Sequence, residues 1–439
     1  MDFITQFEQT LQHTIEQGLT QDAGQLLAGF AQTRQPYTMR IYALINRLRQ
    51  KQMPFRIPFI PGSPFRILLY KSDNYILNYI AGQFAAFFRS QGCETMFFDP
   101  LYFEESSKAL FHFLKEGLDA AFFFNNVGLL QTLRDGTSLW ETLGVPCFDF
   151  LVDHPMYYAD SLDHALQHTT VLCADRTHCD YVTRFYNHVK HTLFLPAGGI
   201  TPNQKPDFSW DNRPMDVLFI GSYKYSAFVP DDEPTKALSA YLRAHTDVPF
   251  DSAAEKIWEA CCADFLSPQT LKDFIQSHRF IETNLTASYR REIIADLLDA
   301  GIHVDIYGEG WQQTGLAAHP NLHLHSPVSF EEGIRLMTQT KILLNHMAWF
   351  KDGASERIFN AMAQGAVCVT DSSLYLDSFL QDGVNCGIFR LPDVASHGVS
   401  AKVKSILDSP ARAAYIAKNA IRLSANHSWQ AHLAELFLA

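Results

Sequence analysis

The strongest constraint on the fold is a regular alternation of short apolar segments with amphipathic helical segments, which runs twice along the chain. Short apolar runs bounded by turn residues are typical of buried strands, and helical segments between them are typical of parallel sheets covered on both faces. The predicted strands are 66–70, 95–98, 119–124, 147–152, 170–173 and 192–195, and then 216–222, 302–307, 322–325, 342–345, 366–370 and 386–389. We therefore expect an α/β protein with two Rossmann-like doubly wound domains.

The length of 439 residues agrees with more than one domain, because single hydrophobic cores stop growing at roughly 250–300 residues. Residues 198–214 are rich in Gly, Pro, Asn and Asp, and we interpret them as an interdomain linker. The predicted parts are a helical extension (1–60, ending in the proline-rich stretch 54–64), a first domain (61–200), a second domain (201–426, with a helical insertion at 232–300) and a terminal helix (427–439).

The composition limits which binding partners and which cellular compartment we expect for this protein. The formal net charge is −12 and no Lys/Arg cluster is present, so we expect neither a nucleic acid nor an anionic membrane as partner. No run of about 18 apolar residues exists to span a bilayer, and the first residues lack the pattern of a signal peptide. The eight cysteines show no CxxC spacing. This pattern predicts reduced thiols in a cytoplasmic protein without a zinc site.

The segment 349–373 contains the most information about a ligand. Gly353-Ala354-Ser355 precedes a predicted helix, and Gly365 ends it before the apolar strand 366–370. The carboxyl ends of parallel strands face the ligand in doubly wound sheets, so two such domains place these ends at one cleft. The amino end of the helix then presents free N–H groups and partial positive charge to that cleft. Such a helix end is suited to a diphosphate.

The order R-x-F-N-A-M-A-x-G-A-x-x-x-T-D, from Arg357 to Asp371, resembles the C-terminal signature of group 1 glycosyltransferases of the GT-B fold. It is most similar to the branch that includes CgeB-type spore maturation proteins. Relatives in this group have two glutamates eight positions apart, one beside the sugar hydroxyls and one beside the ribose. The matching positions here are Asp352 and Asn360, so the chain departs from that pattern at both.

Four shorter segments agree with the resemblance over about 300–425 and, less closely, over 65–223. Residues 219–223 resemble the first strand and glycine turn of the donor domain, and 304–311 resemble the strand and turn beside the nucleotide base. Residues 329–332 resemble a capped helix start, and 151–155 resemble a strand end on the acceptor side. The resemblance implies transfer of a hexose-type sugar from a nucleoside diphosphate sugar to an acceptor glycan or protein.

The residues expected to bind the donor follow from this resemblance. We expect Arg357, with Lys351, to balance the diphosphate charge, because a cation is needed where the leaving group gains negative charge. Asn360 and Glu356 are expected at the nucleoside and Asp352 at the sugar. The remaining predicted donor-site residues are Gly221, Ser222, Tyr307, Gly308 and Ser355.

On the acceptor side, Asp153 and His154 follow the fourth predicted strand, and either side chain is a candidate to take the acceptor proton. With Arg357 they form the predicted catalytic set. We expect no cofactor and no metal ion. His319, His323, His325 and His346 lie close in sequence, but no Cys or carboxylate completes a convincing ligand set around them.

Two other functions use the same features. A nucleotide-sugar epimerase of the same build would use the same donor site. A non-catalytic module would explain the altered Asp352 and Asn360 positions as a decayed site, with the helical segments 1–60 and 232–290 as docking surfaces. The donor base, the sugar, the acceptor, the stereochemical course and the oligomeric state do not follow from the sequence.

Overall fold

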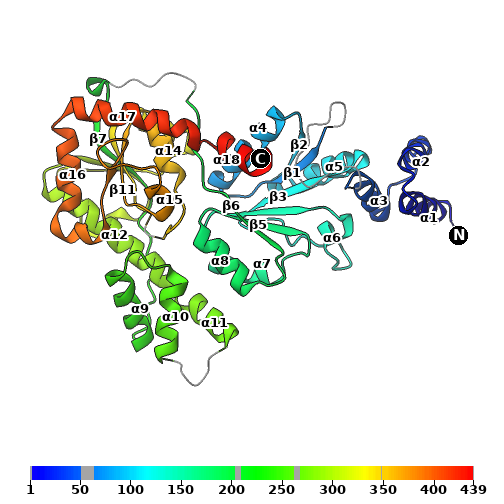
Figure 1. Ribbon diagram of the computed structural model, residues 1–439, viewed down its shortest axis with the longest axis horizontal. Helices are drawn as coiled ribbons and strands as arrows, with labels where there is room; N and C mark the ends of the chain where they lie inside the picture. Colours follow the sequence, from blue (N-terminus) through cyan, green and yellow to red (C-terminus); the bar gives the residue numbers. More distant parts are fainter. Residues whose placement is uncertain (1, 51–63, 203–208, 262–266, 348, 439) are drawn as a thin grey trace.

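The computed structural model describes residues 2–50, 64–202, 209–261, 267–347 and 349–438. Most of the predicted proline-rich stretch 54–64, the middle of the predicted linker (203–208) and Cys262 lie outside these residues. Within them, the chain forms two parallel six-stranded sheets, each flanked by helices (Figure 1). The predicted α/β fold with two doubly wound domains is confirmed.

The first sheet has the strand order β2-β1-β3-β4-β5-β6, and every pairing is parallel. Its strands are β1 (Arg66–Tyr70), β2 (Glu94–Phe98), β3 (Ala120–Phe124), β4 (Cys147–Leu151), β5 (Thr169–Cys173) and β6 (His191–Phe194). The helices between them are α4 (Tyr75–Ser90), α5 (Phe103–Phe113), α6 (Leu139–Leu143), α7 (Ala159–Asp163) and α8 (Arg176–Phe185). The central strands β1, β3, β4 and β5 are buried along their whole length, which explains their largely apolar sequences.

The second sheet has the order β12-β11-β10-β7-β8-β9 and is also parallel throughout. Its strands are β7 (Met215–Ile220), β8 (Val304–Tyr307), β9 (Leu322–His325), β10 (Thr340–Leu344), β11 (Val367–Thr370) and β12 (Gly387–Ile388). Its helices are α12 (Phe280–Asp299), α13 (Phe330–Met337), α14 (Glu356–Ala363), α15 (Leu374–Asp377), α16 (Gly398–Leu407) and α17 (Pro410–Ser424).

The predicted helical insertion 232–300 divides into two parts. Ile293, Ile294 and Leu297 of α12 pack into the core of the second sheet, so α12 is the crossover helix between β7 and β8. The helices before it, α9 (Glu233–Ala244), α10 (Phe250–Cys261) and α11 (Pro268–His278), instead share a core with the first domain. Arg184 of α8 also forms an ion pair with Glu255 of α10 at 2.6 Å. The insertion therefore bridges the two domains.

The terminal helix α18 (Trp429–Leu438) returns to the first domain and lies beside α4 (Figure 1). Trp429, Leu433 and Phe437 pack there among the buried phenylalanines of α4 and β3. The connection from β6 crosses this return path, where Gly199 N donates to His427 O and Trp429 N donates to Gly199 O at 2.9 and 3.0 Å. The two domains are thus joined by two chain crossings.

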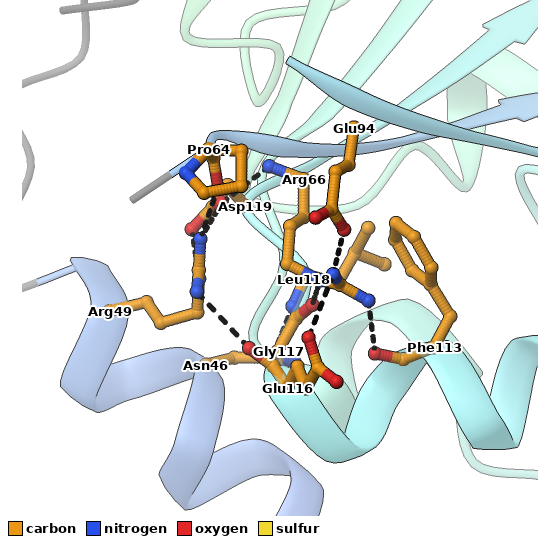
Figure 2. A network of polar contacts seen from close by, with 10 residues as sticks. All are labelled: Asn46, Arg49, Pro64, Arg66, Glu94, Phe113, Glu116, Gly117, Leu118 and Asp119. Atoms are coloured by element: carbon orange, nitrogen blue, oxygen red, sulfur yellow. Dashed lines mark hydrogen bonds and ion pairs between the residues drawn. The ribbon is translucent and has the colours of Figure 1, made fainter. Parts of the chain in front are cut away.

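The N-terminal helices α1 (Phe3–Glu16) and α2 (Thr20–Gln32) project from the first domain, while α3 (Met39–Gln50) is built into it (Figure 1). Figure 2 shows the polar network that fixes α3. Arg49 donates to both carboxylate oxygens of Asp119 at 2.7 and 2.6 Å, and Asp119 also accepts from Arg66 N at 2.7 Å. Asn46 donates to Leu143 O and accepts from Leu118 N. The extension is therefore anchored at the amino ends of β1 and β3.

Candidate active site

A cavity of about 760 Å³ lies between the two domains, at the carboxyl ends of both sheets. The first domain contributes Asp153 after β4 and the segment 73–76 after β1, and the second contributes the turns after β7 and β8 and the starts of α13 and α14. Eight of the predicted site residues line it: Asp153, Gly221, Ser222, Tyr307, Gly308, Glu356, Arg357 and Asn360. Their contacts with a ligand stay predictions.

Two arginines meet at the glycine turn after β7. Arg357 of α14 donates from Nη1 to Ile220 O at 2.9 Å, and Arg290 of α12 donates from Nη1 to Ser222 O at 2.6 Å. Both line the cavity, and neither forms an ion pair with a carboxylate in the described part of the chain. The pKa of Arg290 is lowered to about 10, first by burial and then by the charge of Arg357. The charge of Asp371 opposes these two effects. Two cations thus lie near each other, and neither is ion-paired with a carboxylate among the described residues.

The Arg290 side chain is incompletely satisfied by the protein. Its Nε is buried and has no hydrogen-bond partner among the described residues. A buried donor without a partner costs about 1–3 kcal/mol, and a second cation nearby adds to that cost. An anionic ligand in the cavity would remove both penalties. The arrangement is therefore suited to a group with two or more negative charges, such as a diphosphate.

The two predicted glycine turns pack directly against each other. A Cβ atom at Gly308 would overlap the backbone of Gly221 and Ser222, so only glycine allows the turns after β7 and β8 to approach this closely. Trp311 is fully buried beneath them and donates from Nε1 to Gly221 O at 2.8 Å. Ser222 accepts at its hydroxyl from Glu309 N at 3.1 Å. Gly308 thus lets the two turns together form one wall of the cavity.

Residues at the start of α14 line the cavity. Ser355 is the N-cap residue, and its hydroxyl accepts from Arg357 N at 3.4 Å and from Arg357 Nε at 3.3 Å. It is buried and does not line the cavity itself. Ser355 therefore serves to close the helix end and to orient Arg357. Glu356 follows it in the first helical turn and lines the cavity.

Asn360 lies one turn further along α14 and is also used by the protein. Its Oδ1 accepts from Ile200 N, in the connection between the domains, at 2.9 Å. The side chain is 1% exposed. The amide NH₂ is the remaining polar group that could meet a ribose hydroxyl. Asn360 therefore couples the donor side of the cavity to the interdomain connection.

The structure does not bring Lys351 or Asp352 to this cavity. Lys351 lies by a second cavity of about 870 Å³ and donates to Thr246 O at 2.5 Å. Asp352 forms an ion pair with Arg176 of the first domain at 3.0 Å, and Asp352 N donates to Asp175 Oδ2 at 2.8 Å. The loop before α14 is therefore tied to the turn after β5.

Of the two acceptor-side candidates, the structure exposes Asp153 and buries His154. Asp153 lines the cavity. His154 is 5% exposed, packs against His178 and Tyr181, and accepts at Nδ1 from Met156 N at 3.0 Å. Burial lowers the pKa of His154 well below its usual value, and the neighbouring His178 lowers it further. His154 is thus a capping residue of the 3₁₀ turn η3 (Pro155–Tyr158) in this structure.

The described residues contain no group of three or more His, Cys, Asp or Glu side chains arranged to hold a metal ion. His325 and His323 instead contact Asp305 at 2.8 and 3.5 Å on the edge of the second sheet. His346 is buried against Asp371 at 3.0 Å. Every helix in the described part of the chain is too short or too polar to cross a bilayer.

Sequence reasoning missed Arg290, because it treated 232–300 as one insertion. A signal was present in the sequence: Arg290 lies three, four and seven residues before Ile293, Ile294 and Leu297, which is the spacing of neighbours on one helix face. An arginine beside several apolar residues on one face needs a partner. The segment 73–76, which lines the cavity from the first domain, gave no comparable signal.

Comparison with known proteins agrees with this geometry. Residues 290–438 match the family model described as glycosyl transferase-like. This segment begins at Arg290 and includes α14. No curated protein sequence matches the chain.

Comparison with solved structures finds similarity at low sequence identity. Sucrose-phosphate synthase from Thermosynechococcus elongatus superposes with a TM-score of 0.52 at 11% identity, over 85% of this chain and 97% of that one. HepE from Anabaena, in complex with UDP and glucose, gives 0.47 at 10% identity, over 85% and 98%. TarM from S. aureus gives 0.44 at 10% identity over 72% of this chain, which spans 53% of TarM. The fold is that of GT-B glycosyltransferases, and the predicted function agrees with the family match.

Proposed function

We propose that this chain is a glycosyltransferase that moves a hexose from a nucleoside diphosphate sugar to an acceptor, within the CgeB-type branch that the 357–371 motif resembles. The observation that carries the proposal is the Arg290–Arg357 pair. Two guanidinium groups converge on one turn of the interdomain cavity, and neither forms an ion pair with a carboxylate among the described residues. A diphosphate supplies the missing negative charge.

The cavity is suited to the rest of the donor. Its volume of about 760 Å³ is within the roughly 300–1,000 Å³ of small-molecule sites. With the diphosphate at Arg290, Arg357 and the amino end of α14, the nucleoside would lie toward Glu356, Asn360 and Tyr307. The sugar would then lie toward Asp153, which faces the cavity from the other domain.

In the transfer step, the bond between the anomeric carbon and the diphosphate oxygen breaks, and the diphosphate keeps the electron pair. The two arginines stabilise that growing charge, which is the role that a metal ion has in other transferases. An oxygen of the acceptor forms the new bond to the anomeric carbon. Its proton passes to Asp153. We therefore propose transfer without a metal cofactor, so that EDTA should leave the rate unchanged.

The proposal is tested with UDP-glucose, UDP-N-acetylglucosamine, GDP-mannose and dTDP-rhamnose, by thermal shift and by release of the nucleoside diphosphate. One donor should stabilise the wild-type protein, and Arg357→Gln should remove the stabilisation, whereas Arg422→Gln on the exposed face of α17 should not. Release of free, altered nucleotide sugar would indicate an epimerase, and binding without turnover would indicate a non-catalytic module. Unchanged stabilisation by that donor in Arg357→Gln would refute the assigned site.

A further inference from the structure

The carboxylate of Asp153 is held from two sides. Tyr158 Oη donates to Asp153 Oδ2 at 2.9 Å, and Asn125 Nδ2 donates to the same oxygen at 3.3 Å. None of the described residues donates a hydrogen bond to Oδ1. One oxygen of the carboxylate is therefore fixed by the protein, and the other is left for a ligand.

Asn125 is held in an unusual backbone conformation to make this contact. It follows β3 with φ of 52°, and Asn126 follows with φ of 63°, so two consecutive residues other than glycine have left-handed backbones. Asn tolerates this region better than most residues, but the conformation still costs free energy. Backbone strain of this kind persists where surrounding contacts enforce it, and it concentrates at functional sites.

The contacts that enforce the conformation come from β4, the strand that leads to Asp153. Asn125 N donates to Phe150 O at 3.0 Å, and Val152 N donates to Asn125 Oδ1 at 2.9 Å. Beneath them, Asp149 is fully buried and accepts from Asn126 N at 3.0 Å. The Asn125 amide thus accepts a hydrogen bond from Val152 N with its oxygen and orients Asp153 with its nitrogen.

Tyr158 is placed by the short turn that His154 caps. His154 Nδ1 accepts from Met156 N, which closes the first turn of η3, and Tyr158 is the last residue of that turn. Burial raises the pKa of Tyr158 far above its usual value, and the neighbouring Asp153 raises it further. The Tyr158 hydroxyl therefore stays protonated and serves as a hydrogen-bond donor.

We infer that Asn125 and Tyr158 are positioning residues, which turn Oδ1 of Asp153 toward the acceptor so that this oxygen can take its proton. The inference rests on the proposed function, because Asp153 acts as the base there. A proton acceptor must lie within hydrogen-bond reach of the group it deprotonates, and small displacements of a reacting group have large effects on rate. It follows that the acceptor nucleophile carries a hydrogen, as a hydroxyl or an amide does.

Two variants separate positioning from backbone strain. Asn125→Gly removes the amide but permits the left-handed backbone, and Tyr158→Phe removes the hydroxyl but keeps the ring. With the stabilising donor of the same four-sugar panel and water as acceptor, each should lower kcat roughly 10-fold and leave the donor KM within twofold. The double variant should approach Asp153→Asn. Tyr415→Phe, on an exposed tyrosine of α17, is the matched control and should match the wild type.

Asn125→Asp gives a sharper comparison. Its carboxylate can still accept from Val152 N, but it replaces the donor with a repelling oxygen beside Asp153, so it should be slower than Asn125→Gly. Wild-type kcat in both Asn125→Gly and Tyr158→Phe, with normal thermal stability, would overturn the inference while leaving the proposed function intact. A rise in donor KM without a change in kcat would also overturn it. Failure of all four sugars to bind the wild type would instead count against the proposed function itself.

Discussion

Replacing Arg290 by glutamine should weaken donor binding without weakening the fold, which is an unusual combination for a buried residue. Burial and the charge of Arg357 lower the pKa of Arg290 to about 10, and each pKa unit corresponds to about 1.4 kcal/mol. Holding this charge within the protein therefore costs about 3 kcal/mol. The lost hydrogen bond to Ser222 O offsets this by about 1.5–3 kcal/mol. The two terms nearly cancel, so the unliganded Tm should stay within a few degrees of the wild type.

Donor affinity, unlike the stability of the unliganded protein, should change strongly in this variant. A charge-assisted hydrogen bond from a guanidinium to a phosphate oxygen contributes about 1.5–3 kcal/mol, so Arg290→Gln should raise the Kd for the donor and for its free nucleoside diphosphate roughly 10- to 150-fold. Arg290→Lys keeps the charge but loses the planar fork, and it should give an intermediate Kd. Arg422→Gln, at an exposed site, should change neither quantity.

Isothermal titration calorimetry with the nucleoside diphosphate, and thermal unfolding of the unliganded variants, measure the two effects separately. A large fall in Tm with unchanged Kd would show that Arg290 serves only to hold the turn after β7. That result would refute the argument that an anion completes the Arg290–Arg357 pair. It would leave open a donor site built on Arg357 and α14 alone.

Three further predictions concern stability. Burial raises the pKa of the Glu282 carboxyl to about 7, above its value in the unfolded chain. The stability that the protonated carboxyl contributes is therefore lost as pH rises from about 4.5 to 7. The Tm of Glu282→Gln relative to the wild type should accordingly increase between pH 5 and pH 8. Gly308→Ala should destabilise the fold by about 2 kcal/mol or more and weaken donor binding, because its Cβ overlaps the turn after β7. Gly82→Ala in α4 is the control. Its Cβ would have nothing within 4 Å, so it should stabilise the fold by roughly 0.5–1 kcal/mol. Trp429→Ala should cost about 3–5 kcal/mol by detaching α18 from the first domain, whereas Leu438→Ala at an exposed position should have little effect.

The fold could be predicted because the sheet interiors impose a simple pattern. Strands such as 120–124 and 367–370 are buried on both faces, and their sequences are continuously apolar. Predicted boundaries were within two or three residues for most strands. The helices of 232–300 were harder, because α12 has almost no apolar stripe distinct from its polar face and its neighbours pack on the other domain. A pattern along the chain does not show which domain a helix covers.

The candidate site was predicted where it follows from strand ends and was missed where it depends on contacts between domains. Arg357, Gly221 and Asp153 follow strands or begin a helix, so their place at the cavity could be expected from the topology. Asp352 was expected at the sugar, but its carboxylate is used by Arg176 of the other domain. Such pairings join residues far apart in sequence, and only the assembled structure shows them.

The contacts between the domains also have a consequence for donor binding. The loop before α14 is tied to the first domain by Asp352 and Arg176, and Asn360 within α14 holds the connection at Ile200. Across the cavity, Phe330 of α13 stacks on Tyr79 of α4 with ring centroids 3.6 Å apart. The elements that bring Arg357 to the cavity are therefore the ones that hold the domains together. The proposed diphosphate site and these interdomain contacts share α14, so donor binding and the contacts between the domains are expected to stabilise each other.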